Sequence, residues 1–84
     1  MTEKKVGQVF SYYPKAEVAA VRMTDGILRK GDKIHILGHT TDFTQNIDSM
    51  QIQAEERDEV RSGEEVGLKV HERVRPNDGV YKIE

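Results

Sequence analysis

The stretch from residue 24 to residue 36 constrains the fold most, because it combines two glycine corners with a strand pattern. Gly26 and Gly31 can adopt the positive φ values that tight corners need, and the aspartate next to each of them can hydrogen-bond its own backbone. Residues 33–37 then alternate polar and apolar side chains, so that the isoleucines point to one face. This combination is typical of small β-barrels. It predicts the architecture of the chain better than its activity.

Five further segments are rich in β-branched and aromatic residues or alternate in polarity, and we interpret them as strands: residues 6–13, 17–23, 43–52, 66–70 and 80–83. Alanine and glutamate would also suit a helix over 17–23. Seven residues between a proline and an Asp-Gly corner are too few for a stable helix, so a strand is favoured. Within 43–52 the apolar residues do not keep a period of two, and a bulge between Ile47 and Met50 would reconcile them.

The segment 54–65 carries six acidic residues and two arginines, which predicts a solvated connector. Short strands separated by turn signals, with no convincing helix, predict an all-β chain. We therefore expect a six-stranded antiparallel β-barrel of residues 6–84 that follows an N-terminal tail of residues 1–5.

The composition limits the possible functions. A chain of 84 residues can hold one domain with a small core, and a net charge of -2 means that any attraction for phosphates must come from a local patch. The chain lacks cysteine, so disulfides and thiolate chemistry are excluded. The first residues do not resemble a signal peptide, and no segment is apolar enough to span a bilayer. We expect a cytoplasmic protein with no membrane partner.

Motifs for catalysis or cofactor binding are missing from the sequence. There is no phosphate-binding loop of the form Gly-x-x-x-x-Gly-Lys-Ser/Thr, so we expect no nucleotide binding. The histidines at 35, 39 and 71 do not have the spacing of metal ligands, and the serines lack a nucleophile motif. We expect no enzymatic activity, no cofactor and no metal.

Two groups of side chains are candidates for binding a partner. The first is a basic and aromatic set that would offer stacking faces and phosphate contacts to RNA: Tyr12, Tyr13, Lys15, Arg22, Arg29, Lys30 and Lys33. Alternatively, the tyrosines pack against the end of a hairpin, and the cations keep the surface soluble. The second is a polar loop that could bond a ligand or a partner backbone, or could simply hold its own shape through Thr41 and Asp42: His39, Thr40, Thr41 and Asp42.

Several of these motifs together resemble a known family. Residues 6–9, 26–34, 49–51 and 62–68 follow the order and spacing of the second domain of translational GTPases, such as elongation factor Tu. Residues 38–43, together with Arg75, Asp78 and 80–82, are similar to small free-standing translation elongation factor-like proteins. A similar barrel forms the carboxyl-terminal domain of some collagenase-like peptidases.

The resemblance implies a non-catalytic binding module that associates with ribosomal RNA or tRNA. The positions equivalent to the family pocket are Ser49, Met50, Gln51 and Glu65. Glu65 stands where elongation factor Tu commonly has asparagine, and a carboxylate there would repel phosphates, so that it either blocks a pocket or lines one. The alternative function is a protein-interaction adaptor, or a detached accessory barrel of a separately encoded enzyme such as a collagenase-like peptidase. Flanking lysines on short edge strands favour a monomer.

Overall fold

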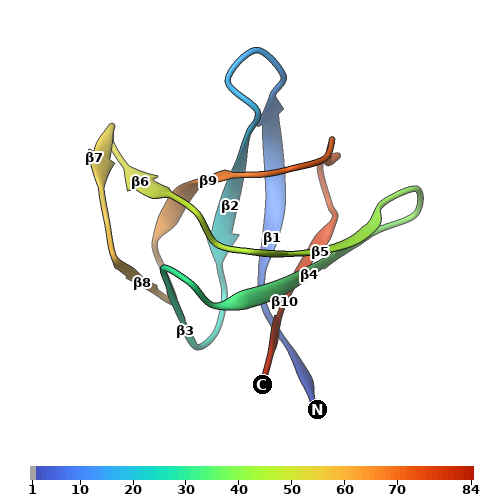
Figure 1. Cartoon of the computed structure of the whole chain (residues 1–84), viewed down its shortest axis with the longest axis horizontal. Coiled ribbons are helices and arrows are strands. Elements are labelled where there is room, and N and C mark those ends of the chain that lie inside the picture. The colour runs from blue at the N-terminus through green and yellow to red at the C-terminus, as the bar shows by residue number, and fades with distance from the viewer. Residues whose placement is uncertain (1) are drawn as a thin grey trace.

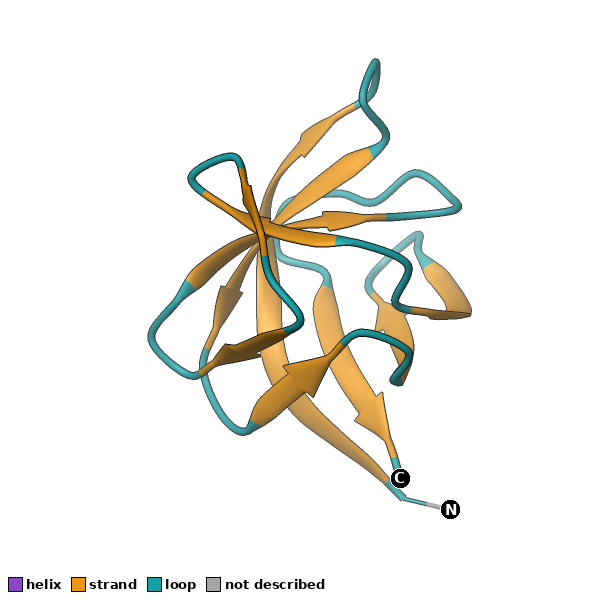
Figure 2. Cartoon of the chain, turned by 60° about the vertical axis from the view of Figure 1, so that its left-hand side comes forward, coloured by secondary structure: helices purple, strands orange, loops and turns teal. Residues whose placement is uncertain are grey.

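The computed structural model describes residues 2–84, and Met1 lies outside the described residues. Figures 1 and 2 show a chain built of strands and loops. Within the described residues no helix is present, and so none could cross a membrane. The described strands are β1 (Glu3–Tyr13), β2 (Val18–Met23), β3 (Ile27–Arg29), β4 (Lys33–Leu37), β5 (Asp42–Asn46), β6 (Met50–Ile52), β7 (Glu55–Glu56), β8 (Glu59–Arg61), β9 (Glu65–Lys69) and β10 (Gly79–Ile83).

The strands form two antiparallel sheets. The larger sheet has eight strands in the order β5-β4-β10-β1-β2-β9-β6-β7, and the smaller pairs β3 with β8. In Figure 1, β1 and β2 run upright through the middle of the view, and β4 and β5 cross it from side to side. The strand order of the larger sheet ends at β5 and β7 and does not return on itself. The predicted all-β class is confirmed, whereas the predicted six-stranded barrel is not, because residues 2–84 contain ten strands and no closed ring of paired strands.

The core is built by the alternation of side chains along the strands. Val9, Val21 and Val66 are fully or almost fully buried and lie on neighbouring strands, since Val9 pairs with Val21 and Val21 pairs with Val66. On β4, Ile34 and Ile36 are buried in the same cluster. Each such side chain contributes roughly 1.5–3 kcal/mol by leaving water, and this burial holds the sheets together.

The strand predicted over 17–23 is confirmed as β2, and those predicted over 33–37, 66–70 and 80–83 correspond to β4, β9 and β10. Strand β1 begins at Glu3, three residues before its predicted start, because Glu3 pairs with Ile83 of β10. Part of the predicted N-terminal tail therefore belongs to the sheet.

The single strand predicted over 43–52 is wrong. The structure divides it into β5, which pairs with β4, and β6, which pairs with β9 and β7. Between them, the Ile47 N–H donates to the Asp32 carbonyl at 2.9 Å, and the Ser49 carbonyl accepts from the Lys69 N–H at 3.1 Å. The chain thus changes partner strands at this point, which explains why its apolar residues keep no common period.

The solvated connector predicted over 54–65 is also wrong in part. It contains β7 and β8, and the Val60 side chain on β8 is fully buried. Val60 pairs with Leu28 on β3, another strand that was not predicted. One apolar residue among many acids is enough to anchor this segment, because its partner strand supplies the facing leucine.

Candidate interaction surface

The surface begins with an irregularity in β1. The pairing of β1 with β2 shifts register between Val9 and Ser11, so Phe10 has no partner of its own. An extra residue of this kind is a β-bulge, and bulges re-aim side chains. Phe10 is 41% exposed although Val9 beside it is fully buried. The bulge therefore presents an aromatic ring to solvent from the centre of the sheet.

One charged side chain lies over this ring, and a second is bonded to the first. The Arg22 guanidinium carbon lies 5.2 Å from the centroid of the Phe10 ring. Arg22 also donates to Glu65 Oε2 from Nε at 3.1 Å and from Nη2 at 2.8 Å. The three residues come from the adjacent strands β1, β2 and β9, and we call them the Phe10 platform. The ion pair is more than half exposed, so it adds little to stability, but it restricts the motion of the arginine over the ring.

Grooves of about 330 Å³ lie on both sides of Phe10. The first crosses from β1 to the β6–β7 turn, and the residues lining it include Tyr13, Ala20, Gln51, Glu65, Val66 and Gly67. The second is lined by Gln8, Val9, Arg22, Thr24 and Asn77, together with Phe10 itself. Glu65 thus lines one groove and Arg22 lines the other.

The turn that borders the first groove has an unusual backbone. Gln53 and Ala54, which join β6 to β7, have φ values of 52° and 64°. Two-residue hairpin turns of this type favour Asn-Gly, because other residues are strained at positive φ. Both residues line the groove. Strain held next to a groove is a common feature of binding sites.

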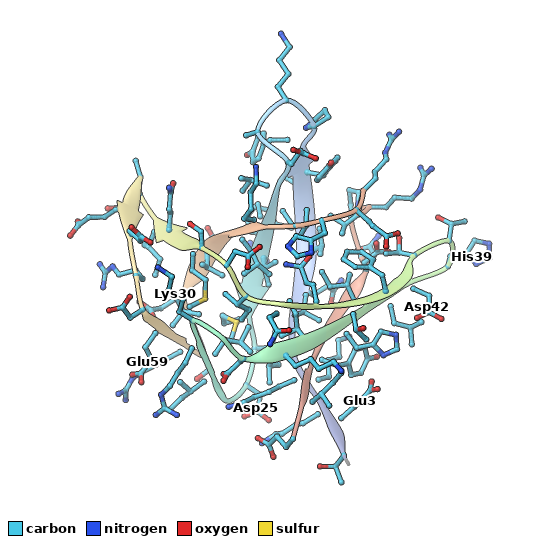
Figure 3. The ribbon with its side chains drawn as sticks, viewed as in Figure 1. Glu3, Asp25, Lys30, His39, Asp42 and Glu59 are labelled. Carbon is cyan, nitrogen blue, oxygen red and sulfur yellow. The ribbon has the colours of Figure 1, made fainter. Side chains whose placement is uncertain are left out.

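The predicted basic and aromatic set does not gather on one face. Arg29 bonds Glu59 at 2.9 Å and Lys30 bonds Glu56 at 3.1 Å, so both cations are paired with acids of β7 and β8. Figure 3 shows Lys30 and Glu59 on the side of β3 and β8, whereas Lys15 belongs to the β1–β2 hairpin loop at the top of Figure 1. Hydrogen bonding to Glu56 raises the pKa of Lys30.

The remaining members of that set have separate surroundings. Tyr13 and Arg22 line the grooves beside Phe10, and Tyr12 packs partly against the core. Lys33 is exposed on β4, where its strand partner is Asn46. The set therefore contributes two residues to the surface around Phe10.

The polar loop between β4 and β5 is held by its own contacts. The Gly38 N–H donates to the Thr41 carbonyl at 2.7 Å, and Thr41 is only 5% exposed. Asp42 contacts His35 at 2.5 Å. Figure 3 shows His39 at the tip of the loop, pointing outward. These contacts agree with the second interpretation of this loop, in which Thr41 and Asp42 maintain its shape.

His35 lies between two carboxylates. Its Nδ1 is 2.8 Å from Glu3 Oε1 and its Nε2 is 2.5 Å from Asp42 Oδ1. Hydrogen bonds to Glu3 and then to Asp42 raise the pKa of His35, and the cluster joins β1, β4 and β5. In residues 2–84 there is no group of three or more histidine, aspartate or glutamate side chains suited to a metal ion.

The positions equivalent to the family pocket divide between core and surface. Met50 is fully buried in the core, whereas Gln51 and Glu65 line the first groove. Ser49 lies next to β6 and uses its carbonyl to accept from the Lys69 N–H. Glu65 therefore lines a groove, bonded to Arg22.

Sequence reasoning missed two residues that shape the molecule. Phe10 was assigned to a strand, but the bulge that exposes it leaves no clear sequence signal. Gln45 is 5% exposed, and its amide donates to the Lys69 carbonyl at 3.0 Å while it accepts from the His71 N–H at 2.8 Å. A polar residue at an inward position between Phe43 and Ile47 is the signal that could have identified it.

Comparison with known proteins assigns the family. Residues 16–71 match the family described as elongation factor Tu domain 2. The chain belongs to the elongation factor Tu domain 2 family. This confirms the resemblance in its broad form, and it agrees with the antiparallel all-β structure.

Two relatives of this chain are described as a protease and a collagenase. It is 35% identical over 80 residues to an uncharacterized protease of Methanocaldococcus jannaschii, covering 94% of this chain and 19% of that protein. It is 29% identical over 80 residues to a collagenase of Porphyromonas gingivalis, covering 94% of this chain and 22% of that protein. The chain thus spans about a fifth of the length of these relatives.

A solved structure matches the domain almost end to end. The C-terminal domain of a Geobacillus thermoleovorans protein described as a U32 peptidase superposes with a TM-score of 0.88 and 26% identity. The match covers 96% of this chain and 93% of that one. The relatives are therefore peptidase domains, not free-standing translation factors, and they give no support to RNA binding or a role on the ribosome.

Proposed function

We propose that this chain is a non-catalytic accessory domain of a U32-type peptidase, which acts through contacts with protein. The observation that carries the proposal is the match with a peptidase C-terminal domain over more than nine-tenths of both chains. The curated protease relatives are about five times longer than the matched region. A domain of this size would contribute binding or positioning while the rest of such a protein performs the chemistry.

The surroundings of His35 support a non-catalytic role. An imidazole that acts as a general base must reach a nucleophile or a substrate proton. Both ring nitrogens of His35 instead contact carboxylates, those of Glu3 and Asp42, within 2.8 Å. These contacts tie strands together and leave neither nitrogen free for a nucleophile.

The charge distribution supports a protein partner. Arg22, Arg29 and Lys30 each bond a carboxylate, and the chain has a net charge of -2. Nucleic-acid affinity depends on cations that replace the counterions of phosphates. Cations that already have a carboxylate partner hold few counterions to release, so they gain less from a phosphate backbone.

A chimera of the Porphyromonas gingivalis collagenase tests the proposal. Four purified proteins are compared: the complete collagenase, the collagenase without the region that this chain matches, and two chimeras that carry this chain or elongation factor Tu domain 2 in that place. Collagen cleavage is measured at equal concentrations. The proposal predicts that removal of the region lowers cleavage and that this chain restores it more than the elongation factor domain does.

Two outcomes would contradict the proposal. Cleavage that is unaffected by removal of the region would show that the domain has no accessory role. Equal activity of the two chimeras would show that any barrel of this family fills the space, with no contribution from the surface of this chain.

A further inference from the structure

We propose that the Phe10 platform is the docking site for an extended polypeptide segment of the partner that carries a basic, an apolar and an acidic side chain on one face. The inference rests on the proposed function in one respect, which is that the partner is a protein. Its place and its chemistry rest on the geometry of Phe10, Arg22 and Glu65, and on the two grooves beside them.

The aromatic ring supplies the central contact. Phe10 is 41% exposed at a bulge, and the guanidinium carbon of Arg22 lies 5.2 Å from the centroid of its ring. A ring that already packs against a neighbouring side chain loses less freedom when a partner arrives than an isolated one, which favours affinity. Aromatic residues flanked by hollows are also the usual anchors of protein interfaces. The ring therefore fits an apolar side chain that spans the two grooves.

The grooves carry opposite charges. Both bonds from Arg22 go to Glu65 Oε2, which leaves Glu65 Oε1 able to accept a further donor. Glu65 lines the first groove and Arg22 lines the second. A basic side chain in the first groove and an acidic one in the second would complement this pair. Alternate residues of an extended strand share one face, so three such side chains span about 13 Å.

Amide side chains in both grooves suit a peptide backbone. The first contains Gln51 and Gln53, and the second contains Gln8 and Asn77. Each amide can both donate and accept, as the peptide groups of an extended segment require. Gln8 Nε2 donates to Asn77 Oδ1 at 3.2 Å, which orients this pair across the second groove.

Single-stranded RNA would also stack on an exposed ring, but the charges disfavour it. Its phosphates would approach the Glu65 carboxylate in the first groove, and RNA has no cationic group to balance that repulsion. A segment that places a basic side chain beside Glu65 avoids this repulsion. We therefore favour a polypeptide over a nucleic acid.

The test is a titration of the isotope-labelled chain, followed by amide NMR shifts, with short peptides capped at both ends. The probe has the core Lys-Thr-Leu-Thr-Asp, and control peptides replace Lys, Leu or Asp with Ser. The proposal predicts shifts centred on Phe10, Arg22 and Glu65, and binding at least fivefold weaker for the peptide without Leu. Phe10→Ala should weaken binding of the probe at least fivefold.

Matched variants separate the site from general effects. Leu37 is 40% exposed, which is close to the value for Phe10, but it lies on β4, so Leu37→Ala should leave binding unchanged. Glu65→Gln should remove the preference for the Lys peptide over its Ser counterpart. Arg22→Gln should likewise remove the preference for Asp.

Several results would overturn the inference: equal binding of all four peptides, shifts away from the Phe10 platform, tighter binding of hexauridylate at Phe10, or self-association of the free chain through this face. Failure of the peptide titration with a successful collagenase chimera would remove this inference and keep the proposed function. Peptide binding at Phe10 with a failed chimera would keep this inference and remove the proposed function.

Discussion

Two arginine–carboxylate clusters of similar geometry lie in different settings. Arg22 bonds Glu65 at 2.8 Å beside the exposed Phe10 ring and its two grooves. On the β3–β8 pair, Glu59 accepts from Arg29 at 2.9 Å and from Arg61 at 2.8 Å. All three arginine side chains are about 60% exposed. The bonds and the exposure of the arginines therefore do not distinguish the two clusters.

The surroundings of the clusters do distinguish them. The Glu59 cluster covers two small strands whose inward side chains, Leu28 and Val60, are fully buried. The Phe10 platform instead leaves an aromatic ring in solvent. Exposed ion pairs contribute little by themselves, so the exposed apolar ring and the adjacent hollows are what distinguish the Phe10 platform. We therefore propose the Phe10 platform, and not the Glu59 cluster, as the binding surface.

Removal of the buried leucine tests the structural role of β3 and β8, and it has the largest expected effect on stability. Leu28→Ala should lower the free energy of unfolding by about 2–5 kcal/mol, because it leaves a cavity opposite Val60. Leu37→Ala, at an exposed position, should change it by less than about 0.5 kcal/mol. Urea unfolding of both variants measures the difference. Equal effects would mean that β3 and β8 are not part of the cooperative core.

A third charged cluster sharpens the comparison because it is partly buried. The His35 side chain is 16% exposed, and hydrogen bonds to Glu3 and Asp42 raise its pKa in the folded chain. Its stabilisation should be complete below a pH of about 6.5, the ordinary value for unfolded histidine, and should be lost as the pH rises through the raised folded value. Urea unfolding at a series of pH values should therefore show stability falling across this window.

Single histidine variants provide the controls for this pH dependence. His35→Gln should flatten the fall in stability, whereas His39→Gln, at the exposed loop tip, should leave it unchanged. A fall that persists in His35→Gln would assign the effect to other groups and leave His35 without a role in joining β1 to β4.

Neutralisation of Glu59 has the smallest expected effect. Hydrogen bonds from Arg61 and Arg29 lower the pKa of Glu59, so its contribution is present above its unfolded pKa and is lost as the pH falls through the lowered value. Because the cluster faces solvent, Glu59→Gln should lower the melting temperature slightly at low salt and less at high salt. A large loss at both salt concentrations would show that this cluster is more than a surface feature.

The sequence predicts the strand class well but not the partners of each strand. Alternation identifies β4 and β9, because one face of each is buried. It fails for β8, where a single valine is buried through the facing Leu28, a contact that no local pattern contains. β-propensity in turn joins β5 to β6, since a change of strand partner over residues 47–49 leaves the local residues β-prone.

The site is less predictable than the fold for a related reason. Arg22 and Glu65 are 43 residues apart, and only the order β1-β2-β9 brings them together beside Phe10. The exposure of Phe10 depends on a bulge in the pairing of β1 with β2. The residue types and the family resemblance suggested a shared basic face, but Arg29 and Lys30 are paired with acids of β8 and β7, away from the Phe10 platform.

The most direct test of the account is to place Phe10→Ala and Leu37→Ala separately in the collagenase chimera that carries this chain. Collagen cleavage is measured for both, with circular dichroism as a check that each chimera is folded. The account predicts that the Phe10→Ala chimera falls to the activity of the enzyme without the domain, while the Leu37→Ala chimera keeps full activity. Equal activity of the two folded chimeras would contradict it.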